Sequence, residues 1–236
     1  MSNNANSLLN KCLSIAQSCL PQTCYLCGAR VRGRPLCAGC EVDLPHHSTA
    51  CCPQCALPSP NGEICGACLK QPPAFDRTLA AFAYAFPLDA LVQQCKYSHA
   101  THLTALFAVH MAHKATTEAA RIDLLLPMPL HPARLAMRGF NQAAEIARRL
   151  SPQVGIPWRA DACRRLRNTP SQAGLDLKAR LRNLRGAFAC DIELSGKRVA
   201  LIDDVMTSGS SLNELARAVR KAGAAEIQAW VLARTL

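Results

Sequence analysis

The chain has 236 residues, half of them hydrophobic, which is enough for one ordinary domain with a core and a small appended unit. No apolar run reaches about 18 residues, and the start lacks a basic leader and a small-residue cleavage site, so we expect a cytoplasmic protein without a membrane span. The formal net charge is +11, and residues 164–185 hold seven Lys and Arg against one acidic residue. Such a patch favours an anionic partner, either nucleic acid or a phosphorylated small molecule.

The first part of the chain divides into two short units. Residues 1–20 carry apolar side chains at helical spacing, which predicts an amphipathic helix. Residues 21–72 form a cysteine-rich head, in which two stretches, CYLCGARVRGRPLCAGC and CPQCALPSPNGEICGAC, each contain CxxC, nine residues and a second CxxC. The metal ligands that this pattern predicts are Cys24, Cys27, Cys37 and Cys40, and then Cys52, Cys55, Cys65 and Cys68.

Zinc explains the head better than a disulfide scaffold or a redox CxxC does. Four thiolates about 2.3 Å from Zn²⁺ form the tetrahedron that it prefers, and a CxxC turn supplies two of them. A structural zinc site contributes roughly 10–16 kcal/mol in apparent binding, against ~2–4 kcal/mol for a disulfide. Tyr25 is the only aromatic residue of the head, so burial alone cannot hold it together. Because four cysteines leave no open coordination position, both sites are expected to be structural.

The spacing leaves two ways to pair the four CxxC motifs. Equal spacers of nine residues favour two sequential sites, although a cross-braced pairing stays open. The second site departs from the usual pattern, because Ala56 stands where glycine is common and Cys51 is a neighbour that could replace Cys52. His46 and His47 lie between the sites, either as substitute ligands or, as we expect, as solvated linker residues.

After residue 72 the composition changes, and residues 73–236 are expected to form one larger domain. Apolar runs predict strands, and apolar spacings of three and four predict helices. The predicted strands are 77–86, 122–129, 197–203 and 226–234, and the predicted helices are 88–97, 101–115, 141–150 and 211–223, with another starting at Pro132. Strands that alternate with helices indicate an α/β fold with a parallel sheet. Ligands of such sheets bind at the carboxyl ends of the strands, here 127–131 and 203–211.

The stretch VALIDDVMTSGSS (199–211) runs a buried strand into two acids and then into hydroxyls around one glycine. Gly209 permits backbone angles closed to other residues, and short side chains leave room for an anion against N–H groups at a helix start. No GxxxxGK[ST] is present, so this is not a nucleoside-triphosphate loop. Asp203 and Asp204 repel phosphate but accept hydrogen bonds, which suits a ribose diol. The stretch therefore predicts a ribose 5-phosphate site, and the alternative is an ordinary capped strand–turn–helix.

This segment resembles the phosphoribosyl-pyrophosphate (PRPP) motif of type I phosphoribosyltransferases. LLLPMPLHPARLAMRGFNQ (124–142), RNTPSQAGLDLKARLRNLRGAF (167–188) and the head followed by PPAFDRT (72–78) narrow the resemblance to the ComF family, which is competence protein F-like and amidophosphoribosyltransferase-like. The match covers nearly the whole chain. It implies a type I phosphoribosyltransferase-like parallel sheet flanked by helices, preceded by a double zinc ribbon.

The resemblance also implies roles for single residues around PRPP. The two acids, Asp203 and Asp204, would hold the ribose hydroxyls. The 5-phosphate would lie on Thr207, Ser208, Gly209, Ser210 and Ser211. The turn over 127–131, with Pro129 and His131, would be the pyrophosphate loop, although His131 is equally suited to a plain polar loop position. Arg134 and Arg138 would pair pyrophosphate oxygens, and Asn141 is expected to cap the following helix.

Two further matches carry less information. Residues 167–185 correspond to a mobile loop that closes over the substrate, where Gln172 and Arg180 match family positions but Ala179 stands where an acid is common. Lys96, followed by Tyr97, matches a pair whose role the sequence does not give. Mg²⁺ is expected to enter with PRPP rather than to occupy a cage of protein ligands.

Two functions follow as hypotheses. The first is a phosphoribosyltransferase with an unknown acceptor, acting on PRPP or another ribose 5-phosphate and linked to DNA uptake or utilisation, with competence machinery proteins as partners. The second is a single-stranded-DNA binding protein on an inactive phosphoribosyltransferase fold. The basic charge supports the second, but few aromatic residues are interleaved with it as stacking platforms. Whether the chain is an enzyme stays open at this point.

Overall fold

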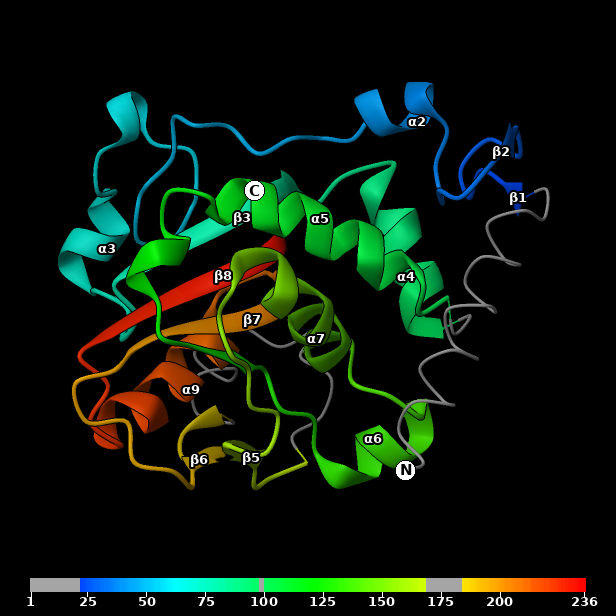
Figure 1. Ribbon diagram of the computed structural model, residues 1–236. Coiled ribbons are helices and arrows are strands. Elements are labelled where there is room, and N and C mark those ends of the chain that lie inside the picture. Colours follow the sequence, from blue (N-terminus) through cyan, green and yellow to red (C-terminus); the bar gives the residue numbers. More distant parts are fainter. Residues whose placement is uncertain (1–21, 98–99, 169–183) are drawn as a thin grey trace.

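The computed structural model describes residues 22–97, 100–168 and 184–236 (Figure 1). The helix predicted over residues 1–20 and the matches at Gln172 and Arg180 lie outside the described residues. No helix in the described ranges is both long and apolar enough to cross a membrane.

A four-stranded parallel sheet forms the centre of the larger domain, as predicted. Its strands are β3 (Arg77–Ala83), β8 (Glu226–Arg234), β7 (Arg198–Met206) and β4 (Leu124–Pro127), in that spatial order. β4 pairs directly with β7, with Pro127 opposite Ile202, so the two predicted ligand-binding strand ends are neighbours. β7 continues three residues beyond its predicted end, so the acid pair lies within the strand, near its carboxyl end.

Helices cover both faces of the sheet (Figure 1). α4 (Leu88–Tyr97), α5 (Leu103–Ala115) and α7 (Gln142–Val154) lie on one face, and α9 (Ser210–Lys221) lies on the other. Alternate residues of β7 enter the two cores, with Ala200 and Ile202 in one and Val199 and Leu201 in the other. This burial on both faces explains the continuous apolar run of the strand.

Three smaller elements complete this domain. A short helix, α6 (Pro132–Arg138), begins at the predicted proline. A two-stranded antiparallel ribbon of β5 (Cys163–Arg165) and β6 (Phe188–Cys190) packs beside α9 and was not predicted. A 3₁₀ turn, η2 (Ala119–Arg121), precedes β4.

The cysteine-rich head lies along the β3 edge and over α5 (Figure 1). Its elements are β1 (Gln22–Thr23), β2 (Arg30–Val31), α2 (Ala38–Val42), η1 (Pro60–Gly62) and α3 (Gly66–Lys70). The linker between its two halves pairs with β3, where the His47 N–H donates to the Ala81 carbonyl at 3.0 Å. His47 is buried, so the expectation of a solvated linker is wrong for this residue. The linker instead covers β3, which would otherwise be an exposed edge of the sheet.

Candidate functional site

The acid pair sits at the carboxyl end of β7 with a lysine beside it. The Asp204 carboxylate lies 2.6 Å from Lys96 Nζ, and these side chains are 16% and 21% exposed. Burial works to lower the pKa of Lys96, but the charge of Asp204 outweighs it and the pKa is raised. Burial and the Asp204 charge raise the pKa of Asp203 to about 8. Lys96 is thus the counter-ion of Asp204, a role that the sequence did not give.

The loop after β7 forms a small polar pocket. Gly209 adopts φ 74° and leads into α9, which has no side-chain N-cap, and the Ser210 N–H donates to Ser208 Oγ at 3.4 Å. Ser208 Oγ lies 2.8 Å from Ser210 Oγ. A cavity of about 50 Å³ is lined by Asp203 and the residues from Val205 to Leu212. Hydroxyls, amide donors and the positive end of a twelve-residue helix together suit a phosphate group.

The loop after β4 approaches the acid pair from the neighbouring strand. The Met128 N–H donates to the Ile202 carbonyl at 2.8 Å, and Asn141 Nδ2 donates to the Met128 carbonyl at 3.0 Å. Asn141 Oδ1 also accepts from Ala143 N and Ala144 N, which confirms the predicted helix cap. Met128, at the start of the loop, is therefore held through both its N–H and its carbonyl.

The predicted basic residues after this loop differ in their surroundings. His131 Nδ1 accepts from the Ala133 N–H, so its ring caps α6. Arg138 donates to Gln142 Oε1 at 3.0 Å and lies over the Tyr97 ring. Arg134 stands one helical turn before Arg138 on α6, as the spacing predicted.

A larger cavity of about 470 Å³ opens between this loop and β5. Pro129, His131, Asn141 and Arg165 are among its lining residues. Arg165 is 9% exposed and lies over the Phe188 ring, and the charges of Arg134 and Asp203 both act on its pKa, which burial lowers. The cavity therefore has a buried cation in its wall. Arg165 was not predicted as a site residue, because β5 was not predicted.

The head holds two clusters of four thiols. Within each cluster all Sγ atoms lie within 4.8 Å of one another. The first cluster consists of Cys24, Cys27, Cys37 and Cys40, and the second consists of Cys52, Cys55, Cys65 and Cys68. The sites are sequential, and Cys51, His46 and His47 belong to neither. Burial works to raise the pKa of Cys52, but N–H groups of Cys65, Cys55 and Gln54 lower it to about 7. Backbone amides aimed at a thiolate suit a structural zinc ion with four sulfur ligands.

Comparison with known proteins gives the family. Residues 15–69 match the double zinc ribbon domain, and residues 135–236 match the phosphoribosyl transferase domain. DNA utilization protein YhgH of Escherichia coli K12 is 34% identical over 225 residues, which cover 92% of this chain and 99% of that protein. The chain belongs to the ComF family. Competence protein F of Haemophilus influenzae is 33% identical over 220 residues, covering 89% of this ComF chain and 90% of its own.

Purine phosphoribosyltransferase from Pyrococcus horikoshii overlaps 54% of this ComF chain and 70% of its own at a TM-score of 0.36 and 21% identity. That likeness is too weak to bear on function. The ComF architecture, a double zinc ribbon before a phosphoribosyltransferase-like parallel sheet, rests on the two domain matches, the strand order and the two thiol clusters.

The thiol clusters make a direct prediction about zinc stoichiometry. Cys52→Ser removes one ligand of the second cluster and is expected to lower bound zinc from two ions to one per chain. Cys51→Ser changes the adjacent cysteine, which lies outside the cluster, and is expected to leave both ions. Elemental analysis of the purified variants measures this. Equal zinc loss in both variants would mean that Cys51 is a ligand.

Proposed function

We propose that this ComF chain binds PRPP with Mg²⁺ at the carboxyl ends of β7 and β4 and transfers its phosphoribosyl group to an acceptor. The observation that carries the proposal is the convergence of three features. A small polar pocket over 205–212 and the acid pair lie at the end of β7, and the loop after the neighbouring β4 lines a cavity of about 470 Å³ whose other wall, on β5, carries a buried arginine. In this proposal the three features hold the 5-phosphate, the ribose diol and the pyrophosphate, respectively.

Each group has a distinct task in this proposal. The loop N–H groups and hydroxyls of 207–211 hold the 5-phosphate, and Asp203 and Asp204 accept hydrogen bonds from the ribose hydroxyls. Arg134 and Arg165 face the leaving pyrophosphate and stabilise its growing negative charge. Mg²⁺ supplies further neutralisation of pyrophosphate oxygens when it is bound. Lys96 balances Asp204 so that the pair does not carry two uncompensated charges in the free protein.

The reaction that these groups support is substitution at the anomeric carbon. The bond from that carbon to pyrophosphate breaks as the acceptor nucleophile forms its own bond, through an oxocarbenium-like transition state. The protein contributes by holding both ends of the substrate and excluding water between them.

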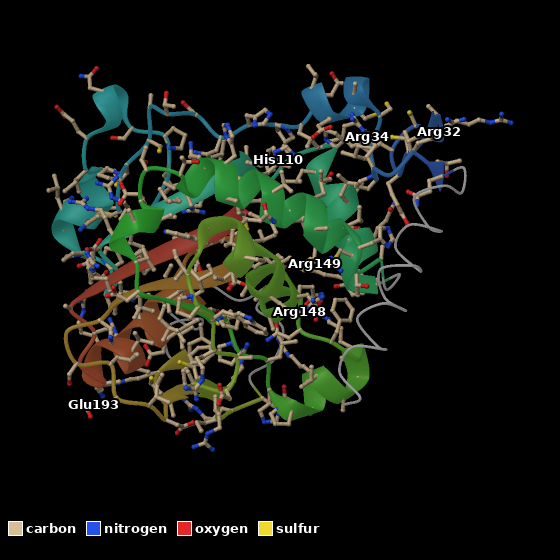
Figure 2. All side chains as sticks on the ribbon, viewed as in Figure 1. Arg32, Arg34, His110, Arg148, Arg149 and Glu193 are labelled. Atoms are coloured by element: carbon tan, nitrogen blue, oxygen red, sulfur yellow. The ribbon has the colours of Figure 1, made fainter. Side chains whose placement is uncertain are left out.

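A role in DNA uptake or utilisation is the biological part of the proposal. Two relatives that cover nearly all of this chain are named DNA utilization protein YhgH and competence protein F. A second function, single-stranded-DNA binding, is favoured by one specific observation. Arg30, Arg32 and Arg34 are exposed in the first half of the head, where Arg32 extends outward and Arg34 lies toward Glu41 of α2 (Figure 2).

Calorimetry with two ligands tests these functions. We expect PRPP with Mg²⁺ to bind at one site per chain, with an affinity that depends weakly on salt. Single-stranded DNA held by the arginines would instead bind with an affinity that falls steeply between about 50 and 200 mM salt. Tight, salt-sensitive DNA binding together with no heat from PRPP would contradict the transferase proposal.

The glycine of the loop provides a sharper mutational test. A Cβ on Gly209 would lie 2.6 Å from Met206 Cε, and φ 74° strains any residue with a side chain. Gly209→Ala is therefore expected to weaken binding of ribose 5-phosphate at least about tenfold and to cost roughly 1–2 kcal/mol of stability. Gly196→Ala is the control, since it has φ 71° but open space around the added Cβ. Equal affinities in the two variants would place the phosphate elsewhere.

A further inference from the structure

Arg234, the last residue of β8, joins two parts of the molecule that are far apart in the sequence. It is 4% exposed. Its Nε donates to the Cys55 carbonyl at 2.8 Å. Its Nη1 donates to the Met206 carbonyl at 3.1 Å and also to the Thr207 and Thr235 carbonyls. One buried guanidinium thus spans from the head to the end of β7.

Both ends of this bridge are functional positions. Cys55 belongs to the second thiol cluster, and its carbonyl is part of the CxxC turn that presents two ligands. Met206 ends β7, and Thr207 begins the phosphate loop. The same turn is also bound to the sheet edge, because the Thr78 N–H donates to the Pro53 carbonyl at 2.9 Å. The second half of the head, which carries this thiol cluster, therefore packs against the wall of the candidate site.

The charge of Arg234 also complements the negative charge expected for the second zinc site. Zn²⁺ with four thiolates has a net charge of about −2, which must be balanced inside a protein. Arg234 lies beside this cluster: burial lowers its pKa, and the charges of Cys55 and Cys68 oppose that change. A buried guanidinium with no anion nearby would be strongly unfavourable. The metal site and the arginine therefore stabilise each other.

We propose that Arg234 is a positioning residue that couples the second zinc site to the phosphate loop, so that residues 207–211 hold their binding geometry only while that site is filled. The proposal rests on the proposed function of this loop. The first thiol cluster provides an internal control, because the residues around it pack on α4 and α5 instead, with Leu36 and Leu44 in that core. Its loss should leave the phosphate loop intact.

The test uses four full-length variants and three measurements. Cys68→Ser opens the second site, and Cys40→Ser opens the first. Arg234→Met removes the donors at similar volume, while Arg234→Lys keeps the charge beside the thiolates but cannot reach both Cys55 and Thr207. The measurements are zinc content, the Kd of ribose 5-phosphate with Mg²⁺, and amide hydrogen exchange over 207–211.

We expect Cys68→Ser and Arg234→Met to raise the Kd about tenfold or more, within the usual range of coupling between sites, and to speed exchange over 207–211. Arg234→Lys should keep two zinc ions yet show the same loosened loop. Cys40→Ser should lose one zinc and stay within about twofold of the wild-type Kd.

Wild-type Kd and exchange in Cys68→Ser or Arg234→Lys would overturn the coupling, as would equal effects of Cys40→Ser and Cys68→Ser. If Arg234→Met does not fold, the lysine variant decides alone. If the wild-type protein binds no ribose 5-phosphate, the proposed function is wrong, and hydrogen exchange on loss of each zinc still decides whether the second site holds the loop.

Discussion

The double variant Asp203→Asn/Asp204→Asn is expected to bind PRPP–Mg²⁺ at least about a hundredfold more weakly than the wild type while keeping its fold. A hydrogen bond to a charged group contributes roughly 1.5–3 kcal/mol, and at pH 8.5, where Asp203 is also ionised, the variant converts two such acceptors to neutral amides. It also removes the negative charge that attracts the cation. Calorimetry measures the affinity, and circular dichroism and a thermal melt check the fold.

A matched control separates site chemistry from net charge. Glu63→Gln/Glu193→Gln neutralises two exposed acids, one in the head and one before the amino end of β7, where Glu193 is labelled in Figure 2. We expect wild-type affinity from this control. An acid-pair variant that folds and still binds at wild-type strength would show that these carboxylates do not contact the ribose.

The raised pKa of Asp203 adds a pH signature. Its folded value of about 8 exceeds its ordinary value near 3.8, so ionising it opposes folding. The resulting loss of stability is absent below about pH 4, grows between about pH 4 and pH 8, and is complete above about pH 8. Asp203→Asn alone should therefore melt higher than the wild type at pH 8.5 and lose that advantage toward pH 4. A site that costs stability in this way is usual where function sets the charges.

Lys96→Met is expected to produce the second large effect. It leaves the Asp204 carboxylate, 16% exposed, without the ammonium group that lies 2.6 Å away. Removing one partner of a buried ion pair costs about 3–5 kcal/mol, and the partial exposure here reduces this to roughly 2–4 kcal/mol. Chemical denaturation measures the loss in the free energy of unfolding.

Two control variants test whether that loss of stability comes from the charge of Lys96. Lys96→Arg keeps the charge and should recover most of the stability, while Lys221→Met removes an exposed lysine of α9 and should cost less than about 0.5 kcal/mol. If Lys96→Met and Lys221→Met were equally stable, the contact with Asp204 would have no energetic role.

The sequence predicted the sheet because its strands are long and buried. The runs that form β4, β7 and β8 carry apolar residues on both faces. Gly223 before β8 and Pro127 and Pro129 at the end of β4 mark strand boundaries. β5 and β6 escaped prediction because each has three residues and they pair across a long separation in sequence. A periodicity needs more residues than that to be visible.

The candidate site divides in the same way. The acids and hydroxyls of 203–211 are contiguous, so the pattern alone indicated their chemistry. Lys96 and Arg234 act through contacts with residues far away in the sequence, Asp204 at 108 positions and Cys55 at 179 positions, and Arg165 lies on the unpredicted β5. Only the assembled sheet brings these cations to the acids and the loop.

The most direct test is a crystal of the protein soaked with PRPP and Mg²⁺. The account predicts electron density for the 5-phosphate against the N–H groups of residues 208–211, with the ribose hydroxyls on Asp203 and Asp204 and the pyrophosphate toward Arg165. Density for PRPP at another position, or a fully formed loop that excludes the phosphate at saturating ligand, would contradict it.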